Sequence, residues 1–342
     1  MFPIRILLPL LVIASICTVA EAPAQIEARG NDPERPWAAD ADELLGEGRF
    51  AQAETAYLAL AGEYGEDPGL WTRIAYTRLQ MGQLAMAMEA AVRATELGPE
   101  DLDAILIRAQ CEAVAGDVES AAATLQKGLE LDPGNTALLE SMTATFIALE
   151  RWPEAAGLLR ELIRTNPNEA AYYMDLGKIL LTSGEFTDAV AAFGQARALG
   201  ADEALALALT GKAHLAAGQW EQAMVEFDQS IALQPNADAY GGRATIHYLE
   251  GDAAAAVTEF RRAVDLAPGD PDLHFNLGNM LVQTGDGPGA EASYRAALAL
   301  DPNIAEAHLN LGILLLNRLQ IAPAEQHLRM AAQLDRELDT PW

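Results

Sequence analysis

The chain has 342 residues, more than one ordinary domain usually holds, so its length predicts either several domains or a repeat array. About half of the residues are hydrophobic, only 6% are aromatic, and 50 acidic residues outnumber 22 basic ones. The resulting net charge of −28 excludes binding to nucleic acid or to an anionic membrane surface through bulk electrostatic attraction.

The first 24 residues have the layout of a secretory signal peptide. Arg5 supplies a positive charge, and the apolar run that follows over residues 6–20 is short for a membrane span. Small residues suited to cleavage precede Glu21 and Gln25. The alternative is an uncleaved membrane anchor. We expect export of the protein, with no membrane insertion of the mature chain.

The two cysteines predict neither lipidation nor an internal disulfide in the exported protein. Ile16 precedes Cys17, whereas a lipoprotein signal places a small residue there, so lipidation is not expected. After cleavage only Cys111 remains, and the mature chain has no internal disulfide. A lone cysteine in a helix favours inert packing over a reactive thiol. The short signal and the alanine-rich composition favour a bacterial periplasmic protein, with residues 25–33 as a flexible lead-in.

The rest of the chain repeats with a period of 33 or 34 residues, which is marked by prolines at 99, 133, 167, 235, 268 and 302. Each repeat is expected to hold a helical half, a turn near its fifteenth position and a second helical half. The predicted repeats are 34–67, 68–101, 102–135, 136–169, 170–203, 204–236, 237–270, 271–304 and 305–338, followed by a tail over 339–342.

Equivalent positions within the repeats share their residue types. The eighth position is Gly or Ala in eight of nine repeats, which predicts a close crossing of two helices. The fifteenth is glycine in seven, with Glu150 and Leu319 as exceptions, which predicts a left-handed residue at the end of the first helix. The twentieth is alanine in all nine, and the twenty-fourth is mostly large and apolar. We expect the large side chain to fill the space left by the small ones.

This pattern resembles the tetratricopeptide repeat (TPR) family over residues 34–338. The repeat at 271–304 has Leu277, Gly278, Ala290, Tyr294, Ala297 and Pro302 at family positions. In the repeat at 102–135, Arg108 and Glu112 depart from the apolar residues that the family prefers. The resemblance implies an all-α, right-handed superhelical solenoid, with first helices lining a concave groove and second helices facing outward.

No catalytic or metal-binding motif stands out in the sequence. We find no His-Glu-x-x-His, Gly-x-Ser-x-Gly or Walker loop, and the glycine-rich string at 285–289 is interpreted as a turn between helices. His214 and His247 share one repeat position, and His274 and His308 share another, at spacings of about 10 Å, too far apart for one metal ion. His327 has no histidine partner in register. A non-enzymatic protein without metal or cofactor is expected.

Two functions from different classes remain open. The first is a protein–protein interaction scaffold that binds a peptide or a helix of a partner in its groove, within a bacterial envelope assembly, secretion or export machine. The second is a polysaccharide-binding or enzyme-regulating subunit of a cell-envelope complex, for which aromatic platforms are needed. Tyr76, Tyr248 and Phe275 are candidates, but they are scattered along the sequence.

The groove is predicted to bind its ligand around residues 174–245, where two of the three lysines share the ninth repeat position. Lys178 and Lys212 form a basic patch in this prediction, unless Asp175 pairs with Lys178 at helical spacing. No lysine occupies the fifth position, so a clamp for chaperone tails is not expected. The predicted groove residues are Lys178, Lys212, Thr245, Asn279 and Phe275.

The last repeat is predicted to be incompletely capped, because no further helix follows residue 338 in this sequence. A helix from about Pro323 to Leu338 leaves Leu328, Met330 and Leu334 in need of cover. Trp342 folding back or self-association through this repeat would supply it.

Overall fold

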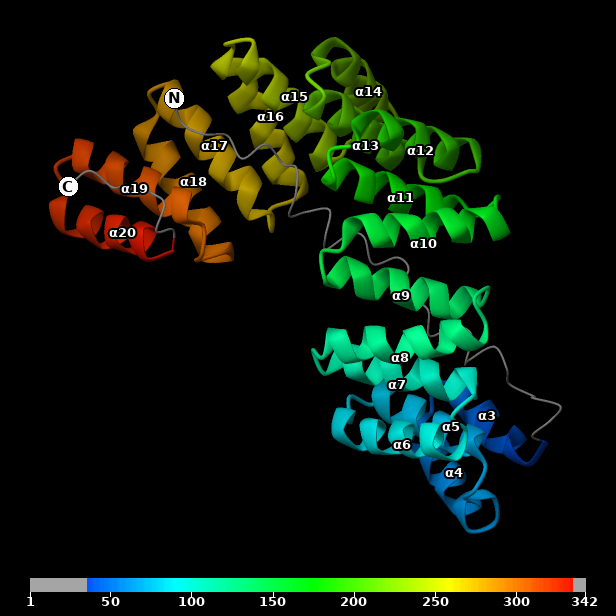
Figure 1. The fold of residues 1–342 in the computed structure, drawn as a ribbon. Helices are drawn as coiled ribbons and strands as arrows, with labels where there is room; N and C mark the ends of the chain where they lie inside the picture. The colour runs from blue at the N-terminus through cyan, green and yellow to red at the C-terminus, as the bar shows by residue number, and fades with distance from the viewer. Residues whose placement is uncertain (1–35, 335–342) are drawn as a thin grey trace. The chain divides into compact units, whose positions relative to one another are not determined.

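The computed structural model describes residues 36–334, and all regular structure in that range is helical. A short 3-10 helix, η2 (Pro36–Ala38), precedes eighteen α-helices (Figure 1). The all-α prediction is confirmed. The predicted signal peptide, lead-in and C-terminal tail lie outside the described residues.

The described chain divides into two compact units, residues 36–183 and 184–334, and each is described by itself. The helices of the first unit are α3 (Ala39–Gly46), α4 (Phe50–Tyr64), α5 (Pro68–Gln80), α6 (Leu84–Leu97), α7 (Leu102–Val114), α8 (Val118–Leu131), α9 (Thr136–Ala148), α10 (Trp152–Thr165) and α11 (Ala170–Thr182). Those of the second are α12 (Phe186–Ala198), α13 (Glu203–Ala216), α14 (Trp220–Leu233), α15 (Ala237–Leu249), α16 (Ala253–Leu266), α17 (Pro271–Gln283), α18 (Gly287–Leu300), α19 (Ala305–Asn317) and α20 (Ile321–Leu334).

Within each unit, every helix packs on the next one along the chain, and some first helices of successive pairs also touch. The contacts between α5 and α7 and between α13 and α15 are of this second kind. Such stacking lets each pair of helices bury an apolar face that it cannot cover alone. In the first unit four hairpins, from α3–α4 to α9–α10, are therefore stacked and followed by α11. In the second unit α12 precedes four stacked hairpins, from α13–α14 to α19–α20.

Most of the first helices begin at a side-chain cap. Asp67, Asp101, Asn135, Asp202, Asn236 and Asp270 each accept a hydrogen bond from a backbone N–H in the first turn of the following helix. These bonds satisfy donors that the helix itself leaves without a partner. The local sequence thus determines where these helices start.

The turn inside each hairpin contains one residue in the left-handed region. Seven of these residues are glycines, from Gly48 (φ 71°) to Gly285 (φ 83°), while Glu150 and Leu319 have φ of 55° and 58°. All nine stand at the fifteenth repeat position, so the prediction of a left-handed turn is confirmed, even where glycine is missing.

We expect Glu150→Gly and Leu319→Gly each to raise the free energy of unfolding by about 0.5–1 kcal/mol. Relief of left-handed strain gains about 1–2 kcal/mol, and the added backbone freedom of glycine offsets part of it. Chemical denaturation measures the change. Gly218→Ala is the matched control, because its φ is 74° and its new Cβ would meet no atom within 4 Å, so it should destabilise by a similar amount. Unchanged stability in all three variants would contradict the argument.

Small and large residues interlock in the core as the sequence predicts. The alanines at the twentieth position are fully buried in every hairpin, and Phe227 and Tyr294 at the twenty-fourth are also fully buried. A Cβ added to Gly211 would lie 2.6 Å from the ring of Phe227, and one added to Gly278 would lie 2.6 Å from that of Tyr294. The rings therefore occupy the space that the glycines leave open.

The last described helix leaves part of its apolar surface uncovered. α20 begins at Ile321 rather than near Pro323, and residues beyond Leu334 lie outside the described chain. Leu328 is buried, whereas Met330 and Leu334 are about 40% exposed. Self-association through this surface stays a prediction. Among the described helices, none is long and apolar enough to span a bilayer.

Candidate functional site

The first predicted groove lysine, Lys178, is held by an ion pair within its own helix. Its ammonium group lies 3.1 Å from Oδ1 of Asp175, and both side chains are buried. The pairing with Asp175 that the sequence indicated at helical spacing is therefore present. This contact neutralises the lysine locally and fixes its side chain on α11.

The second lysine, Lys212 on α13, pairs with a carboxylate of the next hairpin. Its Nζ lies 2.5 Å from Oδ1 of Asp238, in the first turn of α15. The pairing was missed in the sequence because the two residues are 26 positions apart. The two lysines belong to different units, and within its own unit each is held by a carboxylate, so neither ammonium group is an isolated positive charge.

The other three predicted groove residues lie in the second unit and are also buried. The hydroxyl of Thr245 donates to the carbonyl of Gly241 at 2.9 Å. Phe275 packs in the core against Tyr294, with ring centroids 6.0 Å apart. That placement argues against Phe275 as an aromatic platform for a glycan.

Asn279 is the centre of a small amide network. Its Oδ1 accepts hydrogen bonds from the hydroxyl of Tyr294 at 2.7 Å and from Nδ2 of Asn310 at 2.9 Å. Burial raises the pKa of Tyr294 to well above its usual value, so the hydroxyl stays a donor. The network joins α17, α18 and α19 and orients the amide side chains of two consecutive hairpins.

A similar polar cluster occupies the ninth position of the first hairpin. Oδ1 of Asp42 accepts from the hydroxyl of Tyr57 at 2.6 Å and from Nε of Arg73 at 2.9 Å. Burial, together with the hydrogen bond to the Asp42 carboxylate, raises the pKa of Tyr57 far above its ordinary value. The ion pair of Arg73 with Asp42 was not predicted from the sequence. Arg73 lies in the following hairpin, and the spacing of residues along one helix does not indicate contacts between hairpins.

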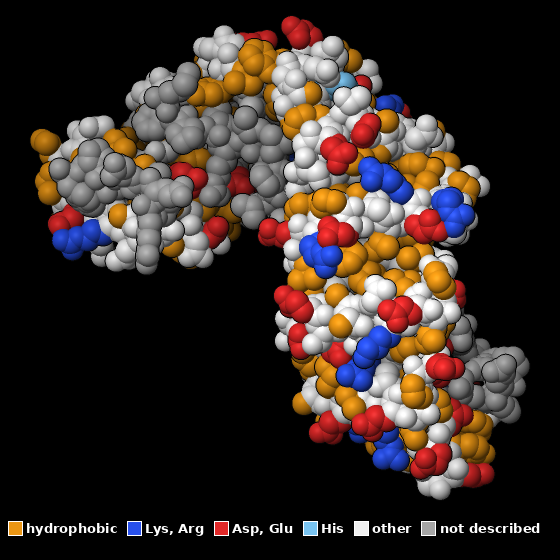
Figure 2. All heavy atoms as spheres, in the orientation of Figure 1, with side chains coloured by type: hydrophobic (Ala, Val, Ile, Leu, Met, Phe, Trp, Pro, Cys, Tyr) orange, Lys and Arg blue, Asp and Glu red, His pale blue; other side chains and the backbone are white. Residues whose placement is uncertain are grey.

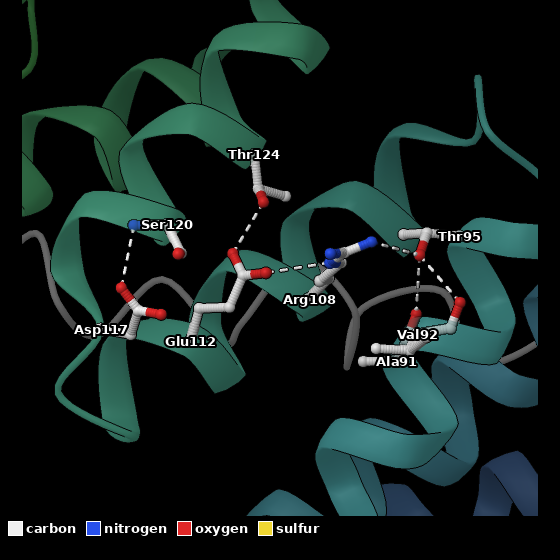
Figure 3. A network of polar contacts seen from close by, with 8 residues as sticks. All are labelled: Ala91, Val92, Thr95, Arg108, Glu112, Asp117, Ser120 and Thr124. Atoms are coloured by element: carbon white, nitrogen blue, oxygen red, sulfur yellow. Dashed lines mark hydrogen bonds and ion pairs between the residues drawn. The ribbon is translucent and has the colours of Figure 1, made fainter.

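The two residues that depart from the family's apolar pattern form one polar network (Figure 3). Nε of Arg108 donates to Glu112 at 2.9 Å, and its guanidinium also donates to the hydroxyl of Thr95 at 3.2 Å. The hydroxyl of Thr124 donates to the other oxygen of Glu112 at 2.7 Å. The network links α6, α7 and α8. The polar groups of Arg108 and Glu112 are thus hydrogen-bonded to each other and to two threonines.

One face of residues 36–183 carries mixed charge. On the face drawn in Figure 2, acidic and basic side chains lie interspersed among hydrophobic ones over residues 36–183. Such a surface does not attract polyanions by a local basic field.

Comparison with known families agrees with the fold. Patterns described as tetratricopeptide repeat match residues 72–136, 145–204, 174–237 and 208–271, and one described as TPR repeat matches residues 278–317. Together these matches cover more than half of the chain. The chain belongs to the tetratricopeptide repeat family.

Individual TPR relatives add support for the fold. Human tetratricopeptide repeat protein 36 is 39% identical over 69 residues, which are 20% of this chain and 36% of that protein. A chain of the APC/C hetero-tetramer Cut9–Hcn1 is similar with a TM-score of 0.54 and 16% identity, over 96% of this chain and 66% of that one. A TPR protein from Parabacteroides merdae ATCC 43184 has a TM-score of 0.52 and 15% identity, over 71% of this chain and 96% of that one. The similarity to the solved structures shows the fold alone.

One histidine contact in this TPR chain was not predicted from the sequence. Nδ1 of His327 lies 2.9 Å from Nδ1 of His308, although the two residues do not share a repeat position. The partner comes from the other helix of the same hairpin, which a comparison of equivalent repeat positions does not detect. Among residues 36–334 no group of three or more potential metal ligands comes together.

The buried cysteine of the TPR stack has the environment of an inert thiol. Burial, with a smaller contribution from the neighbouring Glu112 carboxylate, raises the pKa of Cys111 to about 12. The thiol is therefore protonated at neutral pH, whereas a nucleophile must be a thiolate.

Proposed function

We propose that this TPR chain is an exported scaffold that binds an extended peptide or a helix of a partner protein along the first helices of its hairpins. TPR proteins mediate protein–protein interaction, and the hairpins extend through the whole described chain. The observation that carries the proposal is the recurrence of polar residues at the ninth position of the first helices, which Ala144 and Ile313 interrupt. The side chains held in place there by ion pairs and hydrogen bonds, which lowers the entropy cost of binding, are those of Asp42, Lys178, Lys212, Thr245 and Asn279.

Export and a role in an envelope assembly, secretion or export machine are part of the proposal. Export is supported by the layout of residues 1–24, with one positive residue, an apolar run and small residues at the cleavage sites. N-terminal sequencing of the protein recovered from the periplasm tests this part. A mature chain that starts at Glu21 or Gln25 supports it, and retention of residues 1–24 argues for an anchor.

Replacing Lys178 and Lys212 together by alanine is expected to weaken binding of a selected peptide by about tenfold. Each lysine is buried and holds a carboxylate of its own unit, Asp175 or Asp238, so without it the polar side chains along the first helices are no longer held in place. Peptides chosen from a displayed library are measured by fluorescence anisotropy over a salt series, and circular dichroism checks that the helices persist.

The third lysine provides the matched control. Lys127 is exposed on α8, a second helix, and Lys127→Ala is expected to leave the affinity unchanged. Equal affinity of the double variant and the parent at every salt concentration would show that the two lysines do not contribute to peptide binding. Binding on a polysaccharide array without any peptide binding would instead favour the glycan-binding alternative.

A further inference from the structure

The last hairpin contains a histidine pair with a defined proton arrangement. Nδ1 of His308 lies 2.9 Å from Nδ1 of His327, and Nε2 of His308 lies 3.1 Å from the carbonyl oxygen of Pro302. A carbonyl only accepts, so Nε2 of His308 carries a hydrogen, and in the neutral ring Nδ1 is then an acceptor. His327 must therefore donate from its own Nδ1. One proton lies between the two rings.

We propose that the His308–His327 pair is an acid-sensitive latch that holds α20 against α19. With one proton between the rings, the pair is a hydrogen bond that joins the two helices. When both rings are protonated, both Nδ1 atoms become donors and the bond is lost. Two positive rings would then face each other at the distance of that bond, and their repulsion favours opening of the hairpin.

The charged side chains around the histidine pair do not remove its sensitivity to acid. Arg295 on α18 adds positive charge, and its carboxylate partner Glu291 is shared with Arg318. On α20, Glu325 pairs with Arg329, and Glu306 on α19 also has an interaction. Glu291 and Glu325 thus each have an arginine partner.

The direction of the pH effect follows from the lowered pKa of His327. Burial first, then the charges of His308 and Arg295, lower the pKa of His327 below its ordinary value. A folded pKa below the unfolded one means that the unfolded hairpin binds more protons. Stability of α20 is therefore greatest above about pH 6.5 and is lost as the pH falls below it.

The neighbouring hairpin supplies a matched contact without the second ring. Nε2 of His274 lies 3.0 Å from the carbonyl oxygen of Pro268, as His308 does from Pro302. The position equivalent to His327 is occupied there by Ser293. A variant of His274 therefore removes the same histidine–carbonyl contact and leaves the pair intact.

Hydrogen exchange of the full chain between pH 5 and pH 7.5 tests the latch. After correction for the intrinsic rate, amides of α20 in the parent are expected to exchange faster at pH 5 than at pH 7.5. His327→Gln should abolish this difference, because glutamine donates to His308 without titrating. His274→Gln should retain it. Equal protection of α20 at both pH values in the parent, or the same pH dependence in His327→Gln, would overturn the proposal.

A second measurement on the parent keeps the test independent of variant folding. Nuclear magnetic resonance titration of the ring signals should show the pair losing its protons in two steps, with one step below pH 6.5. Two rings that titrate independently near 6.5 would contradict a shared proton.

Discussion

Replacing Gly242 by alanine is expected to destabilise the unit of residues 184–334 by about 3 kcal/mol or more. The added Cβ would lie 2.1 Å from Cζ of Phe227 and 2.4 Å from Cε2 of the same ring. The ring cannot move away, because it is fully buried and Gly211 on α13 also lies close to it, so that a Cβ added there would be 2.6 Å from the ring. Relief requires a shift of α15 relative to α14, which disturbs the stacking of both hairpins.

Chemical denaturation and hydrogen exchange of α13 to α15 measure this effect. Gly194→Ala is the matched control, because Gly194 is exposed within α12 and its new Cβ would meet no atom within 4 Å. That variant is expected to gain up to about 1 kcal/mol from helix propensity. Adding Phe227→Leu to Gly242→Ala should recover part of the loss. Equal stability of the two alanine variants would refute the packing argument.

Replacing Arg108 by leucine is expected to lower the free energy of unfolding of residues 36–183 by about 2–3 kcal/mol. The guanidinium is the charged partner of Glu112, whose side chain is only 9% exposed, so the change leaves a buried carboxylate with the hydroxyl of Thr124 as its remaining partner. Loss of one partner of a fully buried pair costs about 3–5 kcal/mol, and the 36% exposure of Arg108 reduces the expected loss.

The double variant Arg108→Leu with Glu112→Leu distinguishes a buried charge from simple loss of packing. It restores apolar residues to both positions and is expected to be as stable as the parent or more stable. Arg164→Leu is the control, since Arg164 and its partner Glu161 are exposed and such pairs contribute less than about 1 kcal/mol. Equal losses in the single and double variants would show that the charges do not matter.

The sequence alone determined the helical hairpins and their turns. Three features recur because the helices of every repeat pack against each other in the same way: alanine at the twentieth position, small residues at the eighth and glycine at the fifteenth. Even Glu150 and Leu319 adopt the left-handed conformation that their position requires. Such features depend on contacts within one hairpin or with its immediate neighbour, and periodicity records them directly.

Only the tertiary structure decided which polar groups meet. Lys212 reaches Asp238, His308 reaches His327, and Asn279 reaches Asn310 across helices, and Gly242 was not singled out in the sequence although it contacts Phe227. These contacts depend on side-chain rotamers and on how two helices cross, neither of which a repeat period encodes. The placement of Phe275 in the core has the same cause, because an aromatic residue on a first helix faces the groove or the core according to the rotation of that helix.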